Sequence, residues 1–234
     1  GGKRSTRALL DAYSNLHASV QSDVVDVLFR RPDSARQLLN RIGAGTIDPK
    51  DVTALQLRSA AVHADADVDR LIRSLWGRIT PGTTEEKLAT MRRFKNDLRA
   101  GSGDIARGRI LFAKHCGSCH QMFGEGNRIG PDLTTANRHD QEALLANIVD
   151  PSAVIRREYL SYTLATDDGR VLTGLLDEQD AAGVTLLTAK KQRIRVPRSD
   201  IETIRESPVS LMPERLLEAI GPQERRDLFA FLMQ

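Results

Sequence analysis

Two cysteines and a histidine are grouped in one short stretch of this 234-residue chain, Cys116-Gly117-Ser118-Cys119-His120, and no other cysteine is present. Cys-x-x-Cys-His is the attachment pattern of a c-type haem. Each thiol forms a thioether with a haem vinyl group, and the histidine binds the iron. The spacing therefore predicts one covalent haem c, held through Cys116 and Cys119, with His120 as an axial ligand.

A partial zinc site is the alternative chemistry for the same stretch, because zinc is also bound by cysteine and histidine. That interpretation requires a further ligand from elsewhere in the chain. Since both cysteines lie in the motif, no disulfide is expected in the rest of the chain.

Composition and charge limit the kinds of partner that this chain is expected to bind. The formal charge is +3, with 34 basic residues spread among 31 acidic ones, and no coherent basic stripe of the kind that binds nucleic acid is visible. No apolar run reaches the roughly 18 residues that span a bilayer. Haem attachment of this type takes place outside the cytoplasm, so we expect a periplasmic or otherwise exported location. Gly1-Gly2 suggests an excised or tagged start, from which an export signal or a larger exported parent has been removed.

The first part of the chain is predicted to be helical. Aromatic residues make up only 4% of the chain, and apolar residues recur at helical spacing. Residues 1–80 are expected to form short helices in antiparallel pairs, like HEAT repeats. Asp33 and Ser34 are expected to cap one of these helices, and Asp48-Pro49 to begin another.

A connector helix is predicted over residues 81–101, opened by a capping box of Thr83 with Glu86. A domain over residues 102–234 is expected to follow it. Its first helix should run from Ile105 to about His115 behind the cap Asp104.

Two features of that second domain go beyond a simple helical pattern. Gly108 lies inside the first helix, where it permits a close crossing with the last helix, Gln223 to Met233. Between these helices the apolar period changes from 3.6 to 2. This change predicts five short strands at about 158–206, forming a small antiparallel sheet or barrel. The fold class is therefore mainly α, with a β insertion.

Several motifs resemble class I cytochromes c. The stretch from Gly103 to Phe112 followed by Cys116–His120 looks like the opening of that family, Gly130-Pro131-Asp132-Leu133 resembles its Gly-Pro-x-Leu loop, and 224–232 its closing helix. Together with Asp150-Pro151-Ser152 and the β insertion, residues 101–234 resemble more specifically the haem-binding domain of the planctomycete and verrucomicrobial (Pirellula/Verrucomicrobium) type.

This resemblance implies a hydrogen bond from His120 to the backbone carbonyl of Pro131, which would fix the tautomer of the imidazole and tune the iron. Members of the group often follow helical repeats and a β-propeller dehydrogenase-like domain in one exported polypeptide. The expected partners are therefore a dehydrogenase domain as electron donor and another periplasmic carrier as acceptor.

The sixth ligand of the iron decides the chemistry. The candidate methionines are Met91, Met122, Met212 and Met233. Met122 follows His120 too closely to cross easily to the other haem face. Met212 lies in a Pro-bounded loop, 208–213, where cytochromes of this class present their ligand, so it is predicted as the distal ligand. His115 and His139 are the rival ligands.

The remaining site predictions concern the walls of the haem pocket. Arg128 is expected either to pair with a haem propionate or to be solvated. The predicted apolar wall consists of Ile129, Leu133, Leu144, Ile148 and Leu211.

Three functions are compatible with these residues. The leading one is a non-enzymatic electron carrier with a single His120/Met212 haem. The alternative is an open-haem peroxidase or small-gas sensor with a displaceable Met212, for which no distal acid–base pair is recognisable. A scaffold with a purely structural haem is the third.

Overall fold

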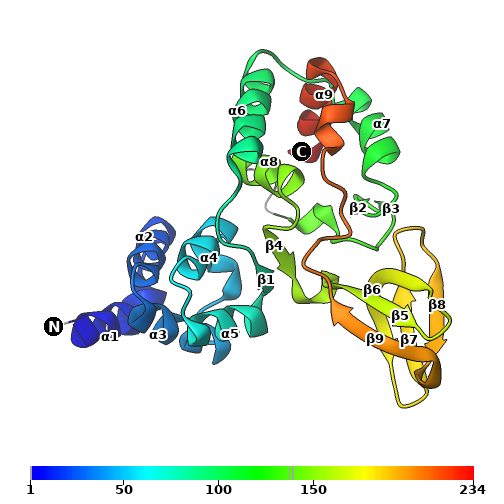
Figure 1. Ribbon diagram of the computed structural model, residues 1–234. Coiled ribbons are helices and arrows are strands. Elements are labelled where there is room, and N and C mark those ends of the chain that lie inside the picture. The colour runs from blue at the N-terminus through cyan, green and yellow to red at the C-terminus, as the bar shows by residue number, and fades with distance from the viewer. Residues whose placement is uncertain (1, 137, 139) are drawn as a thin grey trace. The chain divides into compact units, whose positions relative to one another are not determined.

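The computed structural model describes residues 2–136, 138 and 140–234. The chain divides into two compact units. Unit 1 contains Gly1–Gly82 with Ala153–Arg157, and unit 2 contains Thr83–Ser152 with Glu158–Gln234. The elements of both units are labelled in Figure 1.

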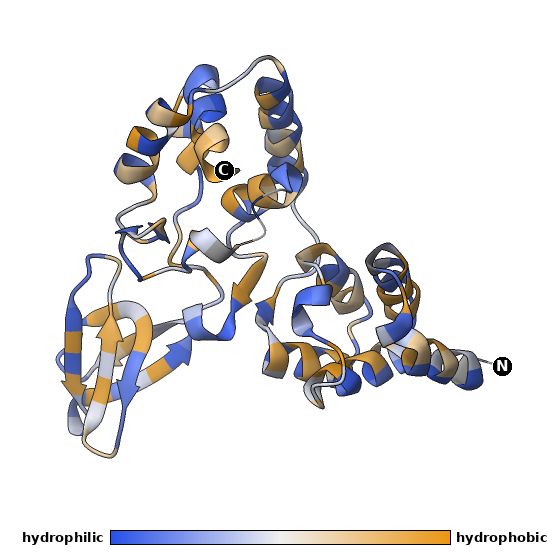
Figure 2. Ribbon diagram, turned by 180° about the vertical axis from the view of Figure 1, so that it is seen from behind, coloured by the Kyte–Doolittle hydropathy of each residue, from blue (hydrophilic) through white to orange (hydrophobic). Residues whose placement is uncertain are grey.

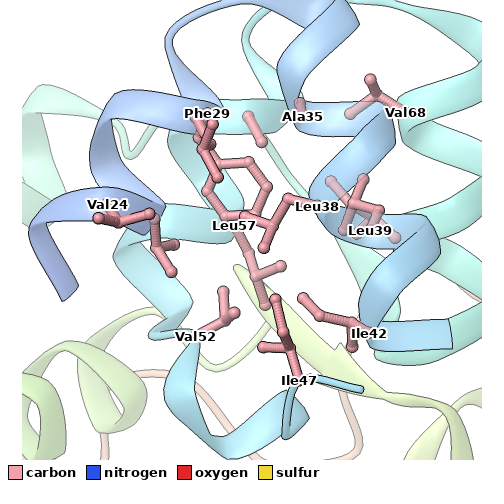
Figure 3. Close-up of a cluster of buried hydrophobic side chains, with 14 of the residues drawn as sticks. Val24, Phe29, Ala35, Leu38, Leu39, Ile42, Ile47, Val52, Leu57 and Val68 are labelled. Atoms are coloured by element: carbon pink, nitrogen blue, oxygen red, sulfur yellow. The ribbon is translucent and has the colours of Figure 1, made fainter. Parts of the chain in front are cut away.

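Unit 1 is built from short helices. They are α1 (Gly2–Ala12), α2 (Ala18–Phe29), α3 (Pro32–Gly43), α4 (Ala54–Ala61) and α5 (Ala66–Leu75). Their apolar faces form one core, in which Val25, Leu38 and Leu39 are fully buried. Figure 3 shows aliphatic side chains of this core around Leu38 and Leu57.

Helix α3 begins earlier than expected. Its first residue is Pro32, preceded by an extended Arg31, because proline is well suited to the first helical position. Ser34 is not a cap. Its buried hydroxyl donates a hydrogen bond of 2.6 Å to the carbonyl oxygen of Leu28.

The helix expected at Asp48-Pro49 is limited to a 3-10 turn, Pro49–Asp51. Helix α4 begins later, at Ala54. Thr53 caps it by a capping box in which its hydroxyl accepts the N–H of Gln56 at 3.3 Å and the Gln56 side chain accepts the N–H of Thr53 at 2.9 Å. A better capping pair therefore lies downstream of the proline.

Unit 1 also contains a strand pair that the sequence pattern did not predict. β1 (Gly77–Ile79) pairs antiparallel with β4 (Val154–Arg156). Gly77 has a φ of +104°, and a Cβ there would lie 2.4 Å from the carbonyl oxygen of Ile155. Glycine is thus required for the close approach of these two strands.

The α-helices of unit 2 surround a second core. They are α6 (Glu85–Arg99), α7 (Ile105–His115), α8 (Gln141–Val149) and α9 (Pro222–Leu232). Phe94 and Leu98 of α6 are buried in this core. Helix α6 is therefore part of unit 2 rather than a separate connector.

The cap of α6 is also shifted by one residue. Thr84, not Thr83, is the N-cap and accepts the N–H of Lys87 at 3.4 Å. The hydroxyl of Thr83 instead donates to the Asp150 carboxylate at 3.0 Å. The buried carboxylate thus engages the hydroxyl that the sequence pattern had assigned to capping.

Helices α7 and α9 cross closely at Gly108. A Cβ at this position would lie 2.0 Å from the carbonyl oxygen of Asp227 and 2.7 Å from the Cβ of Phe231. Phe231 packs against Phe112 of α7 with ring centroids 5.5 Å apart. The predicted crossing at Gly108 is therefore confirmed.

A buried carboxylate ties the N-terminus of α7 to α9. Asp227 is 2% exposed. It accepts the backbone N–H of Asp104 at 2.8 Å and the side-chain amide of Gln223 at 2.8 Å, and pairs with Arg107 at 3.0 Å. Burial alone would raise the pKa of Asp227, but these donors together hold the pKa below its usual value.

The predicted β insertion is present as five antiparallel strands. They are β5 (Ser161–Thr166), β6 (Val171–Gln179), β7 (Gly183–Leu187), β8 (Arg193–Pro197) and β9 (Ile201–Glu206). Their order is β8-β7-β6-β5-β9, so among the described residues β8 and β9 are edges of an open sheet rather than neighbours in a closed barrel. Hydrophilic and hydrophobic residues are interspersed along these strands (Figure 2), and in β8 they alternate from Arg193 to Val196. The hydrophobic side encloses Leu164, Val184 and Leu186.

Within the part of the chain that the structure describes, no helix combines the length and the apolar character needed to cross a membrane.

Substitution of Gly108 by Ala tests the helix crossing. The added methyl group meets backbone rather than a flexible side chain, so we expect a loss of about 1–3 kcal/mol in the free energy of unfolding. Gly101→Ala is the control, because its Cβ would lie 3.5 Å from the flexible Arg226 side chain. Denaturant unfolding with equal losses for both variants would contradict the close crossing.

Asp227→Asn tests the buried carboxylate. We expect a loss of about 2 kcal/mol near neutral pH, since charge-assisted hydrogen bonds are removed. The folded-state pKa is lowered, so the wild-type advantage is present above about pH 4 and lost as the pH falls below it. Unfolding curves from pH 7 to pH 3 measure this. A gap between wild type and variant that does not change with pH would count against the interpretation.

Candidate haem site

The Cys116–His120 motif forms a tight turn where α7 ends. The backbone N–H groups of Cys116 and Gly117 both donate to the carbonyl oxygen of Phe112 at 2.8 Å. Those of Cys119 and His120 donate to the carbonyl oxygen of Cys116 at 3.0 and 2.9 Å. The end of α7 therefore sets the backbone path of the motif. This turn carries His120 and the two cysteines, which form no disulfide.

The downstream segment 127–131 is bonded to this turn. The N–H groups of Ile129 and Gly130 donate to the carbonyl oxygen of Cys119 at 3.0 and 2.8 Å. The side-chain amide of Asn127 donates to the carbonyl oxygen of Gly117 at 2.8 Å. The two segments thus form one hydrogen-bonded unit.

His120 is oriented by this segment. Its Nδ1 lies 2.9 Å from the carbonyl oxygen of Pro131, which is the hydrogen bond that the family resemblance implied. Because a carbonyl only accepts, Nδ1 carries the proton and Nε2 has the lone pair that binds a metal.

Gly130 packs against the imidazole face. A Cβ at Gly130 would lie 2.7 Å from Cε1 and 3.0 Å from Nδ1 of His120. Any larger residue would therefore displace the ring or the loop. This glycine is a site residue whose role follows from its contact with the ring.

The thiol of Cys116 lies in a partly buried environment. It packs against the core of unit 2. Burial, with a smaller contribution from Cys119, raises the pKa of Cys116 to about 11. As a free thiol it is therefore protonated near neutral pH, in a site suited to an uncharged group such as a thioether.

These observations fit a c-type haem. Two thiols flank one turn, the adjacent imidazole has Nδ1 bonded and Nε2 available, and Gly130 leaves room for the ring. No group of three or more His, Cys, Asp or Glu side chains among the described residues is arranged to hold a metal ion. The zinc alternative therefore lacks a ligand set in the described part of the chain.

The other predicted pocket residues have mixed environments. Ile129 is buried, whereas Leu133, Leu144 and Ile148 are half-buried and pack against the core of unit 2. Leu211 is half-buried as well. Arg128 is exposed, and its Nε donates to the side-chain oxygen of Gln121 at 2.5 Å.

Three of the four methionines have a place in the core of unit 2. Met122 is fully buried there, and Met91 and Met233 pack against it. Met212 is half-buried in the segment between β9 and α9, outside that set of core residues. Its availability as a ligand remains a prediction.

His115 and His139 are the histidines that compete with Met212 as predicted distal ligand. His115 is the last residue of α7, and its buried Nε2 has no hydrogen-bond partner in the described part of the structure. His139 lies outside the described residues. His115 and His139 stay the alternatives to Met212 as distal ligand.

A small hairpin directly after the motif was missed by the sequence reasoning. β2 (Gln121–Met122) pairs with β3 (Glu125–Gly126). Gly126 has a φ of +97°, and a Cβ there would lie 2.1 Å from the carbonyl oxygen of His120. The two glycines at 124 and 126 were the available signal for this turn.

Comparison with protein families supports this site. Residues 105–186 match the model of the family described as cytochrome c. The match includes Cys116–His120 and Pro131 but ends before Met212. It supports a c-type cytochrome domain, which is a haem-binding electron-transfer module. No curated protein matches the chain.

Gly130→Ala tests the orientation of His120. The methyl group would push the ring from its bond to Pro131, and a less basic imidazole stabilises ferric iron less well. If the ferric state loses about 1 kcal/mol of stabilisation relative to the ferrous state, the one-electron reduction potential rises by about 40 mV. Potentiometry of the haem-loaded variant measures the shift. Gly101→Ala is the control, and equal potentials for the two variants would show that Gly130 does not position the ring.

Proposed function

We propose that unit 2 is a monohaem c-type cytochrome domain that transfers one electron through an iron ligated by His120 and Met212. The observation that carries this proposal is the hydrogen bond from His120 Nδ1 to the Pro131 carbonyl. When bound, haem c supplies a reversible one-electron couple between ferrous and ferric iron. The cofactor is one haem c, attached at Cys116 and Cys119.

The roles of the surrounding residues follow from their chemistry. His120 keeps its proton on Nδ1 and offers Nε2 to the iron. The Met212 thioether favours the ferrous state and raises the potential relative to a bis-histidine site. The apolar side chains Ile129, Leu133, Leu144, Ile148 and Leu211 would exclude water from the haem. The exposed Arg128, which donates to Gln121 in this structure, would pair with a propionate.

The domain is proposed to act as a carrier rather than an enzyme by itself, serving a larger oxidoreductase in the periplasm or another exported location. The electron donor is a dehydrogenase domain and the acceptor another periplasmic carrier. The five-stranded insertion supports assignment to the planctomycete and verrucomicrobial type. Unit 1, as a HEAT-like helical segment, provides docking and spacing.

The absorption spectrum of the ferric protein tests the ligand pair. We expect a low-spin, six-coordinate spectrum with the weak far-red band of methionine ligation, which Met212→Ala should abolish. Met91→Ala is the control and should retain the band. A high-spin wild-type spectrum would favour the open-haem peroxidase or sensor. A band that survives Met212→Ala would refute the His120/Met212 pair.

A further inference from the structure

The segment that carries Met212 is tied down upstream of the methionine. The backbone N–H of Ser210 donates to the hydroxyl of Ser152 at 3.1 Å. The N–H of Met212 donates in turn to the hydroxyl of Ser210 at 3.1 Å. The peptide of the proposed ligand is therefore linked to the chain just after α8.

The β insertion holds the same segment at its start. Ser161, the first residue of β5, is fully buried. Its hydroxyl donates to the carbonyl oxygen of Val209 at 2.7 Å, and its own carbonyl accepts the N–H of Ser207 at 2.8 Å. The segment thus leaves the sheet in a fixed direction.

Downstream of Met212, a lysine from α6 makes the corresponding contact. Nζ of Lys87 lies 2.6 Å from Oε1 of Glu214 and 2.7 Å from Oδ1 of Asp150. Asp150 is the residue that ends α8, and its side chain is 8% exposed, against 45% for Glu214. Lys87 therefore bridges the buried carboxylate of Asp150 and the more exposed carboxylate of Glu214, two residues after Met212.

The backbone adopts a rare conformation directly after this contact. Arg215 has a φ of +66°, in the left-handed region that a non-glycine residue rarely adopts. Its guanidinium lies 3.4 Å from Glu86 and 3.6 Å from Glu218. Such a conformation persists only where neighbouring contacts hold it, which indicates that the return from Met212 to α9 is constrained.

We propose that Lys87 is a positioning residue for Met212. Its bridge between Asp150 and Glu214 holds the downstream end of the segment 207–214, and the Ser161 and Ser152 contacts hold the upstream part. Held at both ends, the segment resists loss of the thioether from the iron. The inference rests on the proposed function, in which Met212 is the distal ligand.

Helix α6 offers a matched control for this role. Lys95 also lies on α6 and pairs with Glu142 of α8, and the exposed fractions of Lys95 and Lys87 are similar, 30% and 24%. Among the described residues, neither Lys95 nor Glu142 forms an ion pair or side-chain hydrogen bond with the segment that carries Met212. Removal of either glutamate deletes one lysine–carboxylate contact, but only Glu214→Ala releases the ligand segment.

Titration of the ferric holoprotein with imidazole tests the proposal, because imidazole must displace Met212 to bind. Loss of one partly exposed ion pair should raise the imidazole affinity of Glu214→Ala about fivefold. Glu142→Ala should stay within about twofold of wild type. Lys87→Met should exceed Glu214→Ala, but it also removes the positive charge beside the buried Asp150 carboxylate, so Glu214→Ala is the variant that decides.

Two further measurements separate the possible failures. Denaturant unfolding of both glutamate variants should show similar, small losses, so that a change in imidazole affinity is not a general loss of stability. Equal imidazole affinities for Glu214→Ala, Glu142→Ala and wild type, with tighter binding by Met212→Ala, would overturn the role of Lys87 alone. No increase in Met212→Ala would overturn the ligand assignment and the Lys87 proposal together.

Discussion

The close crossing of α7 and α9 is the constraint on which the candidate site depends. Only a residue without a Cβ fits at Gly108, where the Asp227 carbonyl approaches. The Asp227 carboxylate adds a polar contact by accepting the N–H of Asp104 before α7. Since the Cys116–His120 turn is bonded to the last turn of α7, the packing of the helix pair determines the direction in which the thiols and imidazole point.

Around this helix pair, the two residues proposed as iron ligands are supported in different ways. His120 is held locally, by Pro131 and Gly130 from a segment close in sequence. Met212 belongs to a segment held from a distance, by Ser161 at the start of the sheet and, through Glu214, by Lys87 on α6. The β insertion and α6 therefore hold the segment that carries Met212 from its two ends, which gives the insertion a structural role within unit 2.

Features marked by a regular spacing of apolar residues, or by a specific motif, could be predicted from the sequence. The five strands of the insertion, helix α7 and the His120–Pro131 contact are of this kind. Pairs of strands two or three residues long, such as β1 with β4, carry no period, and their pairing is decided by distant parts of the chain. The shifted cap of α6 has the same origin, because the hydroxyl of Thr83 is engaged by Asp150. Local patterns do not reveal such tertiary competition.

The function proposed for unit 2 depends on one haem attached covalently at Cys116 and Cys119. Mass spectrometry of the peptide that contains both residues, from protein exported by a host with a haem-attachment apparatus, measures this directly. We expect one haem on that peptide, retained in acid, and no haem on the same peptide from a variant with both cysteines replaced by alanine. A haem-free peptide with two free thiols, or haem that dissociates in acid, would contradict it.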